Sequence, residues 1–147
     1  MSTNLNAASS YGPAYSASYN TTVLTAGRVL MALIFVYFGY MKLMNFGGSI
    51  GYFAKWGLPM PTVMAALAVM FELGGGLLLL VGWKTRWVAW ALAIYVVIAT
   101  AVAHRFWTYD AAQAFNQTSH FFKNVSIIGG LLYIAGVGPG RYAIDKN

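Results

Sequence analysis

The chain has 147 residues, of which 59% are hydrophobic and 8% are charged, and its formal net charge is +6. Soluble domains carry about 25% charged residues, so this composition excludes a water-soluble globular protein and indicates a one-domain integral membrane protein. Its Lys and Arg residues lie singly near the ends of apolar runs, which argues against nucleic-acid binding, and the lack of cysteine excludes disulfides, cysteine-ligated metal centres and covalent c-type haem.

The first apolar run covers residues 23–42 and follows a polar segment, residues 1–22, that we expect to be a flexible tail. The run is long enough for a transmembrane helix, which needs about 20 residues. Arg28 lies near its start and Lys42 at its end. At about 100° per residue, both side chains lie on the same side of the helix. The first predicted helix therefore has a cationic face.

A segment rich in glycine and aromatic residues, 43–61, connects the first two apolar runs. It is longer than the usual connection of about 4–6 residues between secondary-structure elements. The spacing of its aromatic residues, which include Trp56, predicts a short helix lying at the membrane interface.

The second apolar run, residues 62–82, carries Glu72 near its centre. A carboxylate at the centre of a membrane costs about 2.5–3.5 kcal/mol on insertion scales, so it is expected to face a partner or a cavity. Ala65, Ala68 and Gly75 share a helical stripe with Glu72 and permit another helix to approach closely. We therefore expect Glu72 to face protein.

Depth in the membrane suggests a partner for Glu72. At about 1.5 Å per residue, Glu72 lies about 15 Å below the side that holds the chain termini, and Arg28 lies about 8 Å below it. This difference is within side-chain reach, so the sequence predicts a structural ion pair between Arg28 and Glu72. Lys42 is expected about 15 Å from the level of Glu72, so a direct pair would need helix tilt, a longer helix or a bridging molecule.

The third and fourth apolar runs cover residues 86–104 and 120–138 and are joined by a polar loop. The third ends at His104, and the fourth carries Lys123 near its start. The sequence therefore predicts an all-α, four-helix transmembrane bundle, residues 23–140, followed by a short charged tail, residues 141–147.

Four spans place both termini on one side of a multi-pass protein of the inner cell membrane. Five of the nine cations lie on the terminal side and four on the other. Lys42 and Lys123 are candidates for an embedded functional role and are therefore left out of the count. The terminal side then holds more of the remaining cations, which predicts cytoplasmic termini.

Five polar residues are expected to converge at the side of the bundle opposite the termini: Lys42, His104, Arg105, His120 and Lys123. We call this end the cationic mouth. Lys42 and Lys123, bounded by Trp56 and Trp107, are candidates to bind an anion, a carboxylate or a quinone carbonyl. Glu72 and His104 are the candidate catalytic residues, forming a proton path below the mouth. No set of residues predicts a metal site.

The same residues also permit structural interpretations, which the sequence leaves open. Glu72 can be an ion-paired residue that fixes helix packing. Lys42 and Lys123 can anchor lipid head groups. His104 can be an interfacial residue without chemistry, and Trp107 can belong to the aromatic belt of a membrane protein.

Several motifs occur in the same order as in the DoxX family of small membrane proteins, which the chain resembles over about residues 25–142. These motifs are Gly27-Arg28, Gly39-Tyr40-Met41-Lys42, Glu72-Leu73-Gly74-Gly75-Gly76-Leu77, Leu80-Val81-Gly82, His104-Arg105-Phe106 and Lys123. The resemblance implies a four-helix membrane bundle that serves as a component of an oxidoreductase system. Related proteins are linked to thiosulfate:quinone oxidoreductase or terminal quinol oxidase complexes.

The resemblance thus implies an integral, quinone-interacting subunit of an oxidoreductase system. A self-sufficient redox enzyme is not expected, because the sequence has no cysteine pair, flavin or dinucleotide fingerprint or metal cluster. Electrons would have to be carried by a quinone or by a soluble or membrane partner subunit. No covalently bound cofactor is expected. Two alternatives are a non-catalytic subunit that anchors or assembles a complex and a small proton-coupled carrier that uses Glu72. Oligomerisation is left open.

Overall fold

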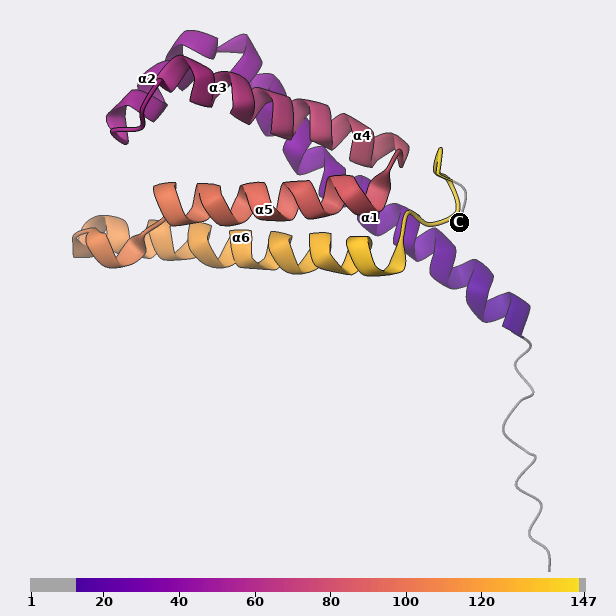
Figure 1. Ribbon diagram of the computed structural model, residues 1–147. Coiled ribbons are helices and arrows are strands. Elements are labelled where there is room, and N and C mark those ends of the chain that lie inside the picture. The colour runs from indigo at the N-terminus through magenta and orange to yellow at the C-terminus, as the bar shows by residue number, and fades with distance from the viewer. Residues whose placement is uncertain (1–12, 146–147) are drawn as a thin grey trace, which may run out of the picture.

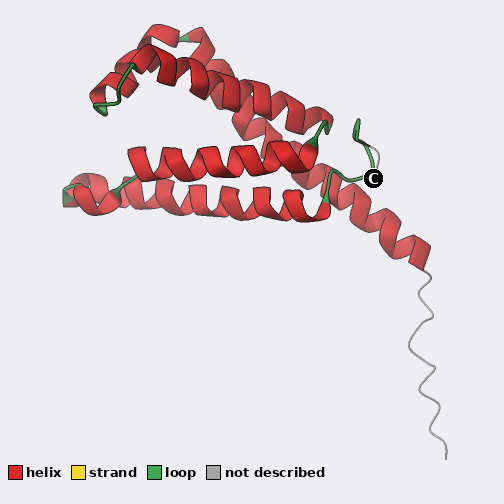
Figure 2. Ribbon diagram, in the orientation of Figure 1, coloured by secondary structure: helices red, strands yellow, loops and turns green. Residues whose placement is uncertain are grey.

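The protein is built from helices joined by short turns, as seen in a computed structural model that describes residues 13–145 (Figure 2). No strand occurs in that range. Four helical stretches are long and apolar enough to cross a membrane: Thr21–Met44, Pro61–Val81, Thr85–Thr108 and Ala111–Val137. The predicted all-α class and four spans are confirmed. Residues 1–12 and 146–147 of the two predicted tails lie outside the described residues.

The first span belongs to a helix that is longer than predicted. Helix α1, Pro13–Met44, begins at Pro13 rather than at Val23, so the second half of the predicted tail is helical. Proline is accepted at a first helical position, and no glycine or proline follows it until Gly27. At its other end α1 extends past Lys42, which lies in the last turn.

The predicted short helix in the first connection is present as α2, Phe46–Lys55. The Asn45 side chain caps it by accepting a hydrogen bond of 3.2 Å from the Gly48 amide. Helix α2 lies at one end of the bundle, where the chain passes from α1 to the second span (Figure 1). This places α2 at the end opposite the C-terminal segment.

The second span consists of three consecutive pieces: α3, Pro61–Val69, a π-helical turn η1, Met70–Gly74, and α4, Gly75–Val81. The π turn contains Glu72 at its centre. Short π segments inside α-helices are rare and frequently occur at functional sites, because the wider turn changes the direction of its side chains. The sequence did not predict this turn.

Helices α5, Thr85–Ala103, and α6, Ala111–Val137, form an antiparallel pair with the most extensive contact in the protein (Figure 1). A short 3-10 turn η2, Phe106–Thr108, lies between them. Helix α6 begins well before residue 120, because Asp110 accepts a hydrogen bond of 3.1 Å from the Gln113 amide and caps the helix. Most of the predicted polar loop is therefore helical.

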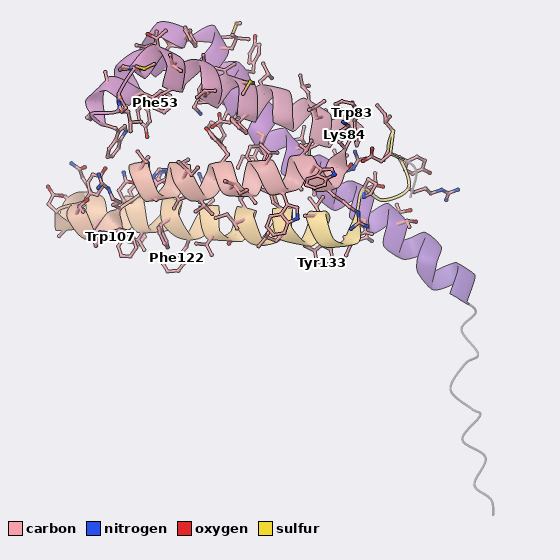
Figure 3. All side chains as sticks on the ribbon, in the orientation of Figure 1. Phe53, Trp83, Lys84, Trp107, Phe122 and Tyr133 are labelled. Atoms are coloured by element: carbon pink, nitrogen blue, oxygen red, sulfur yellow. The ribbon has the colours of Figure 1, made fainter. Side chains whose placement is uncertain are left out.

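Small residues allow the helices to approach closely. The buried core contains Ala32, Ala89, Ala93 and Ala135 together with larger aliphatic residues. Many large apolar side chains point outward instead, and Leu30 and Trp87 are 70% and 78% exposed. Because these outward residues belong to membrane-spanning helices, they face the lipid bilayer. Trp83 and Trp107 lie at opposite ends of the bundle (Figure 3), as expected for aromatic belts.

The crossing of α1 over the second span depends on Gly39. A Cβ atom added to Gly39 would lie 2.3 Å from the backbone nitrogen of Leu73, next to Glu72. Gly76 makes a similar approach to Phe35 and Val36 of α1. These contacts fix the register between α1 and the π turn.

Replacing Gly39 with Ala is expected to destabilise the protein by about 1–3 kcal/mol, because the added methyl group must push α1 away from the π turn. Thermal unfolding of the detergent-solubilised protein provides the measurement. Gly27→Ala is the matched control in the same helix, since nothing lies within 4 Å of its added Cβ, and it should be neutral or slightly stabilising. Equal melting temperatures for the two variants would contradict the proposed close contact.

The C-terminal segment closes the end of the bundle opposite α2. The Asp145 carboxylate accepts hydrogen bonds from the amides of Lys84 and Thr85, at 2.8 and 2.7 Å, where α5 begins. The bond from the Thr85 amide, assisted by that from Lys84, lowers the pKa of the Asp145 carboxyl from its ordinary value of 3.8. The segment thus supplies the N-terminal cap that the α5 sequence lacks.

The stability that the Asp145 cap contributes should depend on pH. A carboxyl with a lowered pKa in the folded protein contributes stability above pH 3.8, and the contribution is lost as pH falls from 3.8 through the lowered pKa. Amide hydrogen exchange at Lys84 and Thr85 should therefore accelerate, relative to neighbouring amides, in that acidic range. Asp145→Asn should already show faster exchange at neutral pH, and unchanged exchange in this variant would refute the cap.

Candidate functional site

The centre of the candidate site is Glu72, and both of its carboxylate oxygens are hydrogen-bonded. The Lys42 ammonium lies 2.6 Å from Oε2, and the Tyr95 hydroxyl donates to Oε1 at 2.6 Å. The side chains of Lys42 and Glu72 are 26% and 12% exposed. The carboxylate is therefore paired and largely covered, whereas its cationic partner is more accessible.

The direct Lys42–Glu72 pair follows from the crossing of the helices. Gly39 contacts Leu73, and Lys42 lies about one turn further along α1. Side chains on a helix tilt toward its N-terminus, so Lys42 reaches back toward the π turn. The predicted separation of about 15 Å was wrong because it assumed parallel helices and a shorter α1.

The predicted ion pair between Arg28 and Glu72 was also wrong, and the same tilt explains why. It directs Arg28 toward the end of the bundle that holds the C-terminal segment, away from Glu72. There its guanidinium donates to the carbonyls of Leu79 and Leu80, at 2.9 Å each, and to the carbonyl of Tyr142. Arg28 is only 1% exposed. It gives a charged donor to carbonyls in the last turn of α4, of which that of Leu79 also accepts from the Gly82 amide, and ties the C-terminal segment to them.

Tyr95 was missed by the sequence reasoning. It lies in the middle of α5, and its ring stacks on Phe71 of the π turn with centroids 5.5 Å apart. This stacking holds the hydroxyl toward the Glu72 carboxylate. The available signal was a phenol in the middle of an otherwise apolar membrane span, where a hydroxyl needs a hydrogen-bond partner.

The two histidines form a separate cluster at the cationic mouth. The rings of His104 and His120 stack with centroids 5.1 Å apart. Nδ1 of His104 lies 2.9 Å from the Gln117 side-chain oxygen, and the Lys123 ammonium lies 3.3 Å from Nδ1 of His120. Between residues 13 and 145, no hydrogen bond joins His104 to Glu72. The predicted path between them therefore has no direct link.

Lys42 and Lys123 are nevertheless brought together at Phe38. Their ammonium groups lie 5.7 and 5.9 Å from the centroid of the Phe38 ring. At these distances the ring face attracts both cations. The two predicted binding lysines thus share one aromatic wall, although they come from helices at opposite ends of the sequence.

The two tryptophans of the predicted mouth are placed differently. Trp56 packs edge-on against Tyr52 and Tyr109, with centroids 6.0 and 6.3 Å away, and connects α2 to the turn between α5 and α6. Trp107 packs against Phe121 and is 62% exposed (Figure 3). Trp56 therefore belongs to the inner wall of the mouth, and Trp107 to its outer surface.

An open groove of about 390 Å³ lies between the end of α1 and α2. We call it the α1–α2 groove. Its lining includes Phe38, Met41, Lys42, Ser49, Tyr52 and Phe53. The Ser49 hydroxyl donates to the Lys42 carbonyl at 3.2 Å and so is engaged with the backbone. Lys42 therefore lies at once on the wall of an apolar groove and on Glu72.

No group of three or more potential metal-ligating residues gathers within residues 13–145. The chemistry available at Glu72 is that of protons and charges: an ammonium, a carboxylate and a phenol in contact. Such a set can hold an anion or a carbonyl oxygen and can exchange a proton.

Comparison with known proteins relates the chain to small membrane proteins. The DoxX family model matches residues 23–105. Inner membrane protein YphA of Escherichia coli is 34% identical over 125 residues, which cover 85% of this chain and 89% of that protein. Inner membrane protein YqjF of the same organism is 34% identical over 119 residues, or 81% and 86% of the two chains.

A more distant relative is the Surfeit locus protein 4 homolog of Schizosaccharomyces pombe. It is 27% identical over 83% of this chain but only 36% of its own length. No solved structure matches the chain. The geometry around Glu72 therefore has to be interpreted from this chain itself.

Proposed function

This chain belongs to the DoxX family and is a multi-pass inner membrane protein, and we propose that it acts as a quinone-binding membrane subunit of an oxidoreductase system. The quinone ring would lie in the α1–α2 groove, with one carbonyl accepting a hydrogen bond from Lys42. Electrons would come from a partner subunit, because the chain has no cysteine with which to bind a cluster or form a redox disulfide.

The observation that carries this proposal is the position of Lys42 on the groove. Binding sites for small molecules are mostly apolar clefts of about 300–1,000 Å³ with a few placed polar groups. The α1–α2 groove lies in this range and combines aromatic and methionine side chains with one ammonium. A quinone, which has an apolar ring and tail and carbonyl acceptors, matches this lining.

Glu72 and Tyr95 supply the proton chemistry that quinone reduction needs. Reduction of a quinone to a quinol takes up two protons with two electrons. Lys42 can donate a hydrogen bond to the carbonyl that gains charge, and the Glu72–Tyr95 pair lies directly behind Lys42. Lys42 and Glu72 thereby take the proton-handling role that the sequence had assigned to Glu72 and His104.

Quinone content of the purified protein tests the proposal. Protein purified in mild detergent from quinone-containing membranes is expected to retain quinone, identified by mass spectrometry of an organic extract. The double variant Lys42→Met with Glu72→Gln should lose most of it, because the hydrogen bond to the carbonyl is removed while no unpaired carboxylate is left. Lys55→Met, which changes an exposed lysine at the end of α2, is the matched control and should retain it. Equal quinone in both variants, or none in the wild-type protein, would contradict the proposal.

A second candidate, a small proton-coupled carrier, is favoured by the position of Glu72 within the membrane span. Its carboxylate is held by a lysine and a tyrosine from two other helices, an arrangement that can change when it is protonated. Solute uptake into proteoliposomes, driven by a pH gradient and lost in Glu72→Gln, would support this candidate. A stable soluble partner, with Glu72→Gln fully functional, would instead support an anchoring subunit.

A further inference from the structure

Lys42 contacts the Glu72 carboxylate and also lines the α1–α2 groove. We propose that the groove binds a lipophilic carboxylate, that Lys42 moves from Glu72 to this ligand, and that Glu72 takes up one proton as it does so. The inference rests on the groove of the proposed function but not on quinone chemistry. It assigns a ligand class and couples ligand binding to proton uptake.

The groups that face Glu72 limit how its charge can be balanced. Lys42 of α1 and Tyr95 of α5 contact the carboxylate, and Tyr52 of α2 lies within electrostatic range of Tyr95. Among the described residues, Lys42 is the one cation in contact with Glu72. Lys123 shares the Phe38 ring with Lys42 and lies against His120, without a contact to Glu72. In this arrangement the charge of Glu72 is therefore balanced by Lys42.

Protonation keeps the site neutral in both states. Without ligand, the charges of Lys42 and Glu72 cancel. With a bound carboxylate, the ligand cancels the charge of Lys42, and Glu72 would be an unpaired anion within a membrane span. A buried charge without a partner takes up a proton rather than remain ionised. The proton is taken from the buffered solution that reaches the mouth, and it forms the O–H bond of the Glu72 carboxylic acid.

Tyr95 allows this exchange without loss of its own hydrogen bond. Its hydroxyl donates to Oε1 of Glu72, whereas Lys42 contacts Oε2. A proton on Oε2 leaves Oε1 as a carbonyl oxygen, which still accepts from the Tyr95 hydroxyl. Only the Lys42 contact is therefore exchanged, and the stacking of Tyr95 on Phe71 can stay as it is.

The form of the groove fits an amphiphile with one negative charge. The Lys42 side chain, which comes from the last turn of α1, supplies the positive charge on the groove wall. Phe38, Met41 and Phe53 supply apolar wall for a chain. Since Lys42 is more exposed than Glu72, a carboxylate can reach the ammonium from the groove before the original pair breaks.

Calorimetric titration of decanoate tests the inference. The full chain is placed in nanodiscs of zwitterionic lipid and titrated near pH 7 in two buffers of different ionisation enthalpy, with empty nanodiscs as the blank. The expected result is saturable binding with uptake of about one proton per decanoate. Decanol, which has the chain without the charge, and acetate, which has the charge without the chain, should not bind in this way.

Variants separate the exchange from ordinary ion binding. Glu72→Gln is expected to bind decanoate about tenfold more tightly, which corresponds to about 1.4 kcal/mol of lost competition for Lys42, and without proton uptake. The double variant Lys42→Met with Glu72→Gln, which leaves no unpaired charge, should not bind it. Lys55→Met should behave as the wild type.

Three results would overturn the inference: no saturable binding to the wild type, binding without proton uptake, or undiminished binding to the double variant. Quinone retention is measured on the same preparations. Retained quinone that decanoate displaces without uptake of a proton refutes this inference alone. Proton-linked decanoate binding by protein that retains no quinone refutes the quinone proposal alone.

Discussion

Replacing Arg28 with Met is expected to destabilise the protein by about 3–5 kcal/mol, because the carbonyls of Leu79, Leu80 and Tyr142 would lose a charged donor within a buried site. A methionine fills the space of the alkyl stem but donates no hydrogen bond. The negative end of the α4 dipole would also lose its counter-charge. Titration of the detergent-solubilised protein with a denaturing detergent, followed by circular dichroism, measures the loss.

Two substitutions show whether the effect comes from the hydrogen-bonding geometry of Arg28. Arg28→Lys keeps the charge but lacks the planar fork, so it should recover only part of the stability. Arg86→Met removes a similar arginine, which donates to the carbonyls of Ala135, Gly136 and Val137 at the end of α6. Because Arg86 is exposed, its removal should cost much less. Equal losses for Arg28→Met and Arg86→Met would show that burial does not determine the effect.

The fold class was predictable from the sequence because apolar run length is a direct consequence of bilayer thickness. The short helix α2 was predictable from its aromatic spacing and flanking turns. The boundaries of α1 and α6 were harder to predict from the sequence, since polar residues such as those following Asp110 occur in both loops and helices. The capping bond from Gln113 to Asp110 decides this case in favour of the helix.

The candidate site was predictable in its residues but not in their pairing. Glu72 and Lys42 stood out because charges in apolar runs are costly. The cation that pairs with Glu72 is determined by the helix crossing, by the contact of Gly39 with Leu73 and by the tilt of the side chains. The lengths of the apolar runs contain no information about these three features. The π turn shifts the register further. A one-dimensional depth estimate therefore selected Arg28, whose side chain points the other way.

The stability of the Lys42–Glu72 pair gives the second large prediction. Lys42→Met alone is expected to destabilise the protein by about 3–5 kcal/mol at neutral pH, because Glu72 loses its cationic partner within a membrane span and must take up a proton from solution to avoid an unpaired charge. Glu72→Gln should cost less, because Lys42 is more exposed and can turn toward the groove and water. The double variant should recover most of the stability, since no unpaired charge remains.

A double-mutant cycle measured at two pH values decides what the pair does. If Glu72 protonates when Lys42 is lost, the destabilisation of Lys42→Met should shrink as pH falls, because the neutral acid needs no counter-charge. The double variant has no carboxylate at this position and should show no such pH dependence. Additive effects of the two substitutions at both pH values would mean that Lys42 and Glu72 do not interact, and exchange of Lys42 between Glu72 and a ligand would then have no energetic basis.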